Sequence, residues 1–203
     1  IIAQDEYENT NELLRQAERI GPDLMFTCVP PEHRGRIYPS ERFPGTELRT
    51  ILTGFAPDDH ETVAGRIDIR AVADRPVGLG YRGRRLSPAY GRLGRLKAEV
   101  GEVMLAEAEL RNVPHDISIE EKDRIYGDEW LRFIASCRCM LGSESGSNTF
   151  DWDGSIHRRC RAETDPASIR RIAEEIEAKE EDVGMGQISP RIFECAMLRT
   201  PMA

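Results

Sequence analysis

The sequence predicts an α/β protein built on parallel sheets. Short apolar runs alternate with longer segments in which apolar residues recur at helical spacing, the pattern of strands joined by helices. With 203 residues, 39% of them hydrophobic, the chain is long enough for one large or two small domains and for a sizeable core. No apolar run reaches the roughly 18 to 20 residues that a membrane-spanning helix needs. We therefore expect no transmembrane segment.

The N-terminal part predicts three strands and one helix. Residues 1–3, 23–29 and 48–55 are apolar runs of strand length. Between the first two runs, apolar side chains spaced for one helix face predict a helix over residues 10–20, which Gly21 ends. Strand, helix, strand, loop and strand is the order expected of an α/β sheet.

A second α/β unit is expected after a polar, turn-rich stretch. Residues 56–70 favour a hinge, or a linker followed by a short helix. Residues 76–81 then predict a strand, and an apolar stripe with a charged opposite face predicts a helix from Leu93 to about Arg111. This part of the chain therefore repeats the strand-and-helix alternation.

The next segment carries two helix-start signals. The capping-box pattern Ser118-x-x-Glu121 predicts one helix start, and Asp128 can cap a following helix. The face of that second helix holds four apolar or aromatic residues: Trp130, Phe133, Ile134 and Cys137. A short strand over 139–141 should follow.

The C-terminal part predicts two more helices. Asp165-Pro166 supplies an N-cap and a proline at the first helical position, and Gly184 is the expected end of that helix. The helix is acidic over residues 165–182, which indicates a solvated face or, alternatively, a partner surface. Ser189-Pro190 starts a helix over 191–198 that runs into a strand-like tail.

Composition narrows the function classes. The 28 basic and 36 acidic residues give a net charge of -8, which argues against nucleic acid as a partner. Five cysteines without a C-x-x-C pair or a secretory signal predict reduced thiols and a cytoplasmic location. We expect no metal site, because Cys137 and Cys139 lack a second ligand pair. The four isolated histidines are interpreted as surface or loop residues.

A cation-rich segment lies after the strand at 76–81. Between residues 76 and 98 there are six cations and no acid: Arg82, Arg84, Arg85, Arg92, Arg95 and Lys97. Cations and a glycine, Gly83, between a strand and a helix suit a diphosphate, because arginine binds oxygens in pairs and glycine permits close backbone approach. A solvated basic loop is the competing interpretation.

Two further segments hold candidate ligand residues. In Gly142-Ser143-Glu144-Ser145-Gly146 a glutamate occupies the position that a nucleophile elbow needs for serine, so a serine hydrolase is not expected. After a strand, this segment lies either at the ligand-binding edge of a sheet or in an ordinary polar turn. Asp151-Trp152-Asp153-Gly154 lacks the further ligands of a calcium loop and is interpreted as a turn.

Glu194 is the most informative single residue. It is a carboxylate within the apolar segment 192–198, and a buried carboxylate needs a partner, so it faces water or binds a ligand. The segment Ser189-Pro-Arg-Ile-Phe-Glu194 resembles the nucleotide-sugar signature of GT-B glycosyltransferases, in which a helix bearing a glutamate precedes a small residue, a proline and a strand.

The resemblance extends along most of the chain and is closest to bacterial family 1 glycosyltransferase-like proteins of the spore-maturation type. Six further segments carry it: Gln4-Asp-Glu-Tyr7, Phe26-Thr-Cys-Val-Pro30, Leu52-Thr-Gly-Phe55, Gly80-Tyr-Arg-Gly-Arg84, Tyr126-Gly-Asp-Glu-Trp130 and Leu141-Gly-Ser-Glu-Ser-Gly146. It implies a GT-B-like, two-domain architecture of Rossmann-like sheets. Residues 1–60 would be the end of the acceptor-side domain, and residues 61–203 a truncated nucleotide-sugar-binding domain.

The resemblance also implies a function, namely transfer of a sugar from a nucleoside diphosphate sugar to an unknown acceptor. The implied binding residues are Arg82, Gly83, Arg84, Lys97, Glu144, Ser145, Gly146, Arg191 and Glu194. Glu194 would hold the ribose, and the donor needs no separate cofactor. A second glutamate typical of many retaining enzymes is replaced by Gly186, and no catalytic residue is identified.

Two expectations complete the sequence-based picture. The chain starts without methionine and ends in an apolar segment, which indicates a fragment that lacks turnover by itself. The alternative function is a nucleotide- or anion-binding α/β module without transferase chemistry. Binding that depends on the sugar discriminates between the two.

Overall fold

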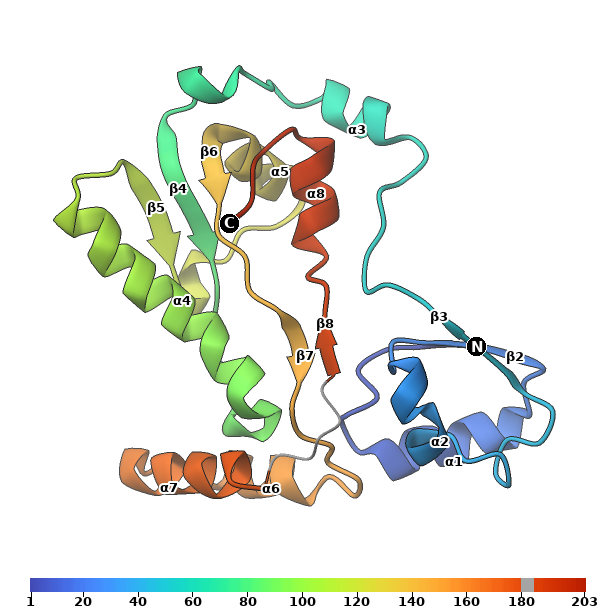
Figure 1. The fold of residues 1–203 in the computed structure, drawn as a ribbon. Helices are drawn as coiled ribbons and strands as arrows, with labels where there is room; N and C mark the ends of the chain where they lie inside the picture. Colours follow the sequence, from blue (N-terminus) through green and yellow to red (C-terminus); the bar gives the residue numbers. More distant parts are fainter. Residues whose placement is uncertain (180–184) are drawn as a thin grey trace. The chain divides into compact units, whose positions relative to one another are not determined.

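The structure is a computed structural model that describes residues 1–179 and 185–203 (Figure 1). It is an α/β protein with parallel sheets, as the sequence predicts. The chain forms two compact units that interleave in sequence. The first comprises Ile1–Thr53, Ser87–Arg95 and Ser145–Gln187, and the second comprises Gly54–Leu86, Leu96–Glu144 and Ile188–Ala203. The expected division into domains at residue 60 stays a prediction.

The first unit is built on a three-stranded parallel sheet. Its strands lie in chain order: β1 (Ile2–Ala3), β2 (Leu24–Thr27) and β3 (Glu47–Thr50). The helix α1 (Thr10–Ile20) joins the first two strands and ends at Gly21, which has a φ of 60° and donates its amide to the Ala17 carbonyl. The short helices η1 (Pro31–His33) and α2 (Arg34–Ile37) lead to β3. The strand expected over 48–55 ends early, at Thr50.

The rest of the first unit contains elements that the sequence analysis missed. Two short strands, β7 (Ser145–Ser147) and β8 (Met185–Gln187), pair antiparallel. The helix α6 (Ser155–Ala162) begins directly after the turn predicted at 151–154. Asp151 supports that start, because its carboxylate accepts the backbone amides of Ile156 and His157 at 3.2 and 2.9 Å.

Other predictions for the first unit are confirmed or corrected. The helix α7 (Pro166–Glu177) starts at the predicted cap, where the Asp165 carboxylate accepts the Ser168 amide at 2.8 Å. The helix ends at Glu177, so the predicted end at Gly184 is wrong; Gly184 itself lies outside the described residues. His157 is not the surface histidine expected: its side chain is 11% exposed, and Nδ1 lies 2.8 Å from the Asp151 carboxylate. The 3-10 helix η3 (Pro88–Tyr90) also belongs to this unit.

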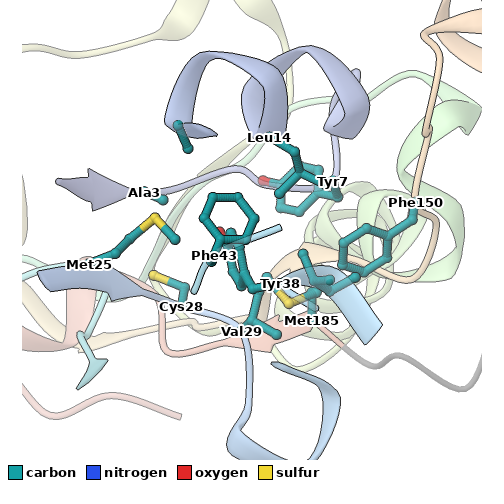
Figure 2. Close-up of a cluster of buried hydrophobic side chains, with 12 residues drawn as sticks. Ala3, Tyr7, Leu14, Met25, Cys28, Val29, Tyr38, Phe43, Phe150 and Met185 are labelled. Atoms are coloured by element: carbon teal, nitrogen blue, oxygen red, sulfur yellow. The ribbon is translucent and has the colours of Figure 1, made fainter. Parts of the chain in front are cut away.

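The core of the first unit joins residues distant in sequence. Figure 2 shows Tyr7, Leu14 and Phe43 gathered in one apolar cluster with Phe150 and Met185. Leu14 is 1% exposed and Met185 is not exposed at all. Because Phe150 and Met185 come from the segment after residue 144, this core ties that segment to the N-terminal sheet. The cluster explains why the unit is discontinuous in sequence.

The second unit is also built on a parallel sheet. Its strands lie in the order β5 (His115–Ser118), β4 (Val77–Arg82) and β6 (Cys137–Met140). The tail extends the sheet beyond β6: Met202 pairs parallel to Met140, and the Met140 amide donates to the Pro201 carbonyl at 2.9 Å. The predicted strand-like tail is confirmed, whereas β5 is a strand that the sequence analysis missed.

Helices cover both faces of this sheet. The long helix α4 (Gly91–Leu110) packs on one face, where Gly101 lies against Tyr81 and Tyr81 Oη donates to the Lys97 carbonyl at 2.7 Å. The helix α5 (Gly127–Ser136) packs against β4 and β6, behind the sheet in the view of Figure 1. The helix α8 (Arg191–Met197) packs against α5.

The remaining helices of this unit are short: α3 (His60–Gly65), η2 (Val72–Asp74) and η4 (Glu121–Asp123). The position of α3 agrees with the short helix expected after a linker. The helix start predicted from the capping box at Ser118 is wrong, because only the short 3-10 helix η4 follows Ser118. Ser118 Oγ instead accepts the Glu120 amide and donates to the Asp123 carboxylate, which makes a turn.

The buried Arg75 side chain links several segments of the second unit through hydrogen bonds. Arg75 is 1% exposed, and its guanidinium donates to the carbonyls of Cys137 and Leu198 at 2.9 and 3.2 Å and to Thr200 Oγ1 at 2.6 Å. It also donates to the carbonyls of Arg70 and Arg199. The Arg75 side chain therefore joins the start of β6 to the chain that follows α8.

Candidate functional site

The candidate site lies where the strand order of the second unit reverses. The chain runs from β4 to β5 on one side, and β6 then lies on the other side of β4. In open parallel sheets, ligands bind in the crevice outside the carboxyl ends of the two strands at such a point. Here those ends are Arg82 and Leu141, the latter directly after β6.

Arg191, at the start of α8, lies at this point. Its guanidinium donates to the Arg82 carbonyl at 2.6 Å and to the Leu141 carbonyl at 2.8 Å. It also lies over two aromatic rings, 5.0 Å from the centroid of Tyr81 and 5.4 Å from that of Trp130. Its Nε is buried and has no hydrogen-bond partner among the described residues. The sequence-predicted Arg191 is thus held at the carboxyl ends of two neighbouring strands.

Glu194 lies three residues after Arg191 on α8, a spacing that places both side chains on one side of the helix. Its Oε2 accepts a hydrogen bond of 2.8 Å from the indole Nε1 of Trp130. The carboxylate is half-buried. The sequence predicts that Glu194 faces water or binds a ligand; the hydrogen bond from Trp130 holds its carboxylate in place, and its contact with a ligand stays a prediction.

Arg82 occupies the same region but its donors are engaged. The guanidinium pairs with the Asp116 carboxylate at 2.8 Å and donates to the Asp123 and Asp116 carbonyls at 3.1 and 3.0 Å. It stacks over Phe133 at 4.3 Å from the ring centroid, and its side chain is 15% exposed. These contacts favour a positioning role for Arg82, and its contact with phosphate stays a prediction.

Gly83 is required for packing. Its amide donates to the Ser118 carbonyl at 2.9 Å, so this N–H is used within the sheet. A Cβ at this position would lie 2.6 Å from Tyr81 Cε1 and 2.8 Å from the Lys97 carbonyl oxygen. Steric crowding therefore explains why a glycine is needed at position 83. The sequence-based expectation is different, namely that the Gly83 amide approaches a diphosphate.

The other predicted cations differ in their surroundings. Arg84 is exposed, Arg85 pairs with Glu102 at 2.5 Å, and Lys97 is half-buried on α4. Arg92 and Arg95 belong to the first unit, where Arg95 pairs with Glu177 at 2.7 Å. The basic segment, which is continuous in sequence, therefore belongs to two compact units.

The segment after β6 is likewise divided. Glu144 is exposed and ends a segment of the second unit, whereas Ser145 and Gly146 lie in β7 of the first unit. Gly146 has a φ of 99°, and a Cβ there would lie 1.8 Å from the Met185 carbonyl oxygen. Only glycine fits this close strand pairing, so Gly146 has a structural role. Contacts of Ser145 or Glu144 with a ligand stay predictions.

Two residues of the site escaped sequence analysis as functional candidates. Asp116 neutralises Arg82, and Trp130 supports both Arg191 and Glu194. Trp130 is predicted only as part of an apolar helix face, and Asp116 lies in the missed strand β5. The alternation of Ile117 and Ile119 with polar neighbours is the signal that could have revealed this strand.

Two buried thiols, Cys137 and Cys195, belong to the second unit. Burial raises the pKa of the Cys195 thiol to about 12 and that of Cys137 to about 11, so both stay protonated and unreactive. In residues 1–179 and 185–203, no group of three or more histidine, cysteine or acidic side chains is arranged to hold a metal ion. Within the same residues, no helix is long and apolar enough to cross a membrane.

Because known proteins offer no match, the functional proposal rests on the structure. No protein-family model matches the chain, and neither the curated proteins nor the solved structures include a significant match.

Proposed function

We propose that the second unit binds a nucleoside diphosphate sugar and that the chain is part of a GT-B-like glycosyltransferase. The observation that carries the proposal is the fixed Arg191 guanidinium at the carboxyl ends of β4 and β6, with the Glu194 carboxylate beside it on α8. This places a cation and a hydrogen-bond acceptor at the sheet position where α/β folds bind nucleotides.

The two side chains suit the two polar parts of such a donor. A carboxylate accepts hydrogen bonds from two neighbouring hydroxyl groups, so Glu194 would hold the ribose. Arg191 and the exposed Arg84 would face the diphosphate, since guanidinium groups bind its oxygens strongly. Trp130 keeps Glu194 in place through its indole N–H.

In the proposed reaction, the bond between the anomeric carbon and the diphosphate oxygen breaks, and a bond to an acceptor oxygen forms. Negative charge builds on the departing diphosphate, and preorganised cations lower the barrier by stabilising that charge. The acceptor proton must pass to a base that the site does not identify. Transfer by this chain alone is therefore not expected, and donor binding is the appropriate measurement.

Titration calorimetry with UDP, GDP, ADP and dTDP tests the proposal. We expect at least one diphosphate to bind, and Glu194→Gln to weaken its binding about tenfold, as loss of a charged hydrogen-bond acceptor does. Gln keeps an oxygen for Trp130. Glu109→Gln, an exposed residue on α4, is the matched control and should bind normally. Failure of all four diphosphates to bind, or equal binding by Glu194→Gln, would contradict the proposal.

A non-catalytic nucleotide-binding module is the second candidate. It is favoured by the engagement of the nearby carboxylates: Asp116 pairs with Arg82, and Asp123 accepts a hydrogen bond from Ser118 Oγ at 2.7 Å. Neither is free to act as a base. If a nucleoside diphosphate and its sugar ester bind with equal affinity, the module is the better description, whereas a tighter sugar ester supports the transferase.

A further inference from the structure

The first unit contains a cavity that the proposed function does not use. Its volume is about 320 Å³, and residues of α6, α7 and the segment before α6 line it. This volume falls at the lower end of the range of small-molecule sites, about 300 to 1,000 Å³. The cavity therefore suits a ligand of roughly one or two rings.

Aromatic and aliphatic side chains supply most of the cavity wall. Phe150 and Trp152 have ring centroids 5.7 Å apart and planes inclined by 30°. Ile156 of α6 and Ile176 of α7 add aliphatic surface. Flat aromatic surfaces attract other rings through stacking as well as through apolar burial. The wall thus favours a planar, apolar ligand body.

Thr149 contributes an unsatisfied polar group. The residue lines the cavity and is 8% exposed, and its Oγ1 is buried without a hydrogen-bond partner in the described part of the chain. Its backbone is already engaged, because the Thr149 amide donates to Ser147 Oγ at 3.0 Å. Leaving a buried hydroxyl unpaired is unfavourable, so a ligand with an acceptor atom would satisfy it.

The charged lining residues within 1–179 and 185–203 carry one excess positive charge. Arg159 and Lys179 are cations, and Glu175 is the acid that opposes them. Arg159 Nη2 pairs with Glu175 Oε2 at 2.5 Å, and this contact holds the pKa of Glu175 below its ordinary value. Among the residues that the structure describes, the lining therefore has a net charge of +1, which a monoanion would neutralise.

We propose that this cavity is a binding site for a small planar aromatic monoanion, such as an aromatic carboxylate. The ring packs against Trp152 and the isoleucines, and the carboxylate approaches Arg159 and Lys179. The Thr149 hydroxyl donates to a ligand oxygen. No residue of the site proposed for the nucleotide takes part, so the two proposals succeed or fail independently.

4-Nitrobenzoate is a suitable probe, because nitroaromatic compounds quench tryptophan fluorescence. The chain has two tryptophans, and Trp130→Phe leaves Trp152, in the cavity wall, as the only reporter. We expect saturable quenching with a dissociation constant of about 1 mM or below, reasonable for a ligand of this size. The neutral 4-nitrobenzyl alcohol should bind about tenfold more weakly. No saturation below about 10 mM, or equal binding of the alcohol, overturns the proposal.

Variants locate the binding within the cavity. Arg159→Gln should weaken 4-nitrobenzoate about five- to tenfold, as loss of a charge-assisted hydrogen bond does. Arg161→Gln removes the same charge from an exposed position of α6 and should leave binding unchanged. Equal weakening by both variants would show that only the general charge of the helix matters, which refutes the site.

Two further variants test the cavity without relying on charge. Ile176→Phe adds a ring where the cavity lies and should abolish saturable quenching, with circular dichroism confirming the fold. If that variant does not fold, Thr149→Val keeps the side-chain shape, removes the hydroxyl and should weaken binding about threefold or more. Unchanged affinity in a folded Ile176→Phe, or in Thr149→Val, contradicts the proposal.

Discussion

Replacement of Arg75 by methionine should destabilise the second unit strongly. The methionine fills a similar volume but provides no hydrogen-bond donor. Three acceptors lose a partner in buried surroundings: the carbonyls of Cys137 and Leu198, and Thr200 Oγ1. The expected result is a loss of stability well above that of an ordinary surface substitution, which is within about 0.5 kcal/mol.

The size of the effect follows from these contacts. A buried acceptor left without its donor costs about 1 to 3 kcal/mol, so three acceptors give a gross loss of at least about 3 kcal/mol. Part of this is offset, because the buried guanidinium is itself unfavourable: burial lowers the pKa of Arg75 below its ordinary value. Removal of one partner from a buried charged network usually costs about 3 to 5 kcal/mol. We expect Arg75→Met to lie near the lower value.

Urea unfolding followed by Trp130 fluorescence measures this loss of stability. Wild type and Arg75→Met both carry Trp152→Phe, so that the fluorescence signal comes from the second unit alone. Arg70→Met is the control, since Arg70 is an exposed neighbour whose ion pair with Asp68 is solvated. A loss below about 1 kcal/mol in Arg75→Met would refute the reasoning, because it would mean that water satisfies the freed carbonyls.

Three other substitutions give further predictions. Gly80→Ala would place a Cβ 2.3 Å from Cys137 Sγ and should lower stability by about 1 to 3 kcal/mol in thermal unfolding. Burial raises the pKa of Glu6, so the carboxyl group binds its proton more tightly in the folded state than in the unfolded state. The contribution of Glu6 to the free energy of unfolding therefore falls as the pH rises above about 4.5. Glu6→Gln should therefore gain stability relative to wild type as the pH rises above about 4.5. Cys160→Ser should remove the fastest thiol reaction with a disulfide reagent, because the other thiols are buried or have raised pKa values.

Each of these results has a contrary outcome. Gly65→Ala, where a Cβ meets open space, should be nearly neutral, and equal losses at both glycines would remove the steric explanation. A constant difference between Glu6→Gln and wild type across the pH range would show that Glu6 has the same pKa in the folded and unfolded states. A fast thiol reaction that persists in Cys160→Ser would place the reactive thiol elsewhere.

The sequence predicts the elements with strong local signals. The α7 start is correct because Asp165-Pro166 is a local cap, and α1 ends at Gly21 because only its neighbours decide that geometry. The strand β5 and the strands β7 and β8 are missed because they are short and are stabilised by partners distant in sequence. Local patterns carry little information about such pairing.

The candidate site is only partly predictable for the same reason. The sequence singles out Arg191 and Glu194 separately, and the structure places both on one short helix, whereas their contact with a ligand stays a prediction. The engagement of Arg82 by Asp116 cannot be read from the sequence, because it depends on the pairing of β4 with β5. The division of the cation-rich segment between two units likewise depends on packing between distant segments.

The double hydrogen bond of Arg191 to two strand ends has a consequence for spectroscopy. Any anion that draws this guanidinium toward itself must lengthen or redirect its bonds to the Arg82 and Leu141 carbonyls. A carbon-13 label at the Leu141 carbonyl would then report occupancy of the crevice as a shift in its infrared stretching band. The backbone itself would serve as the sensor, with no dye and no turnover required.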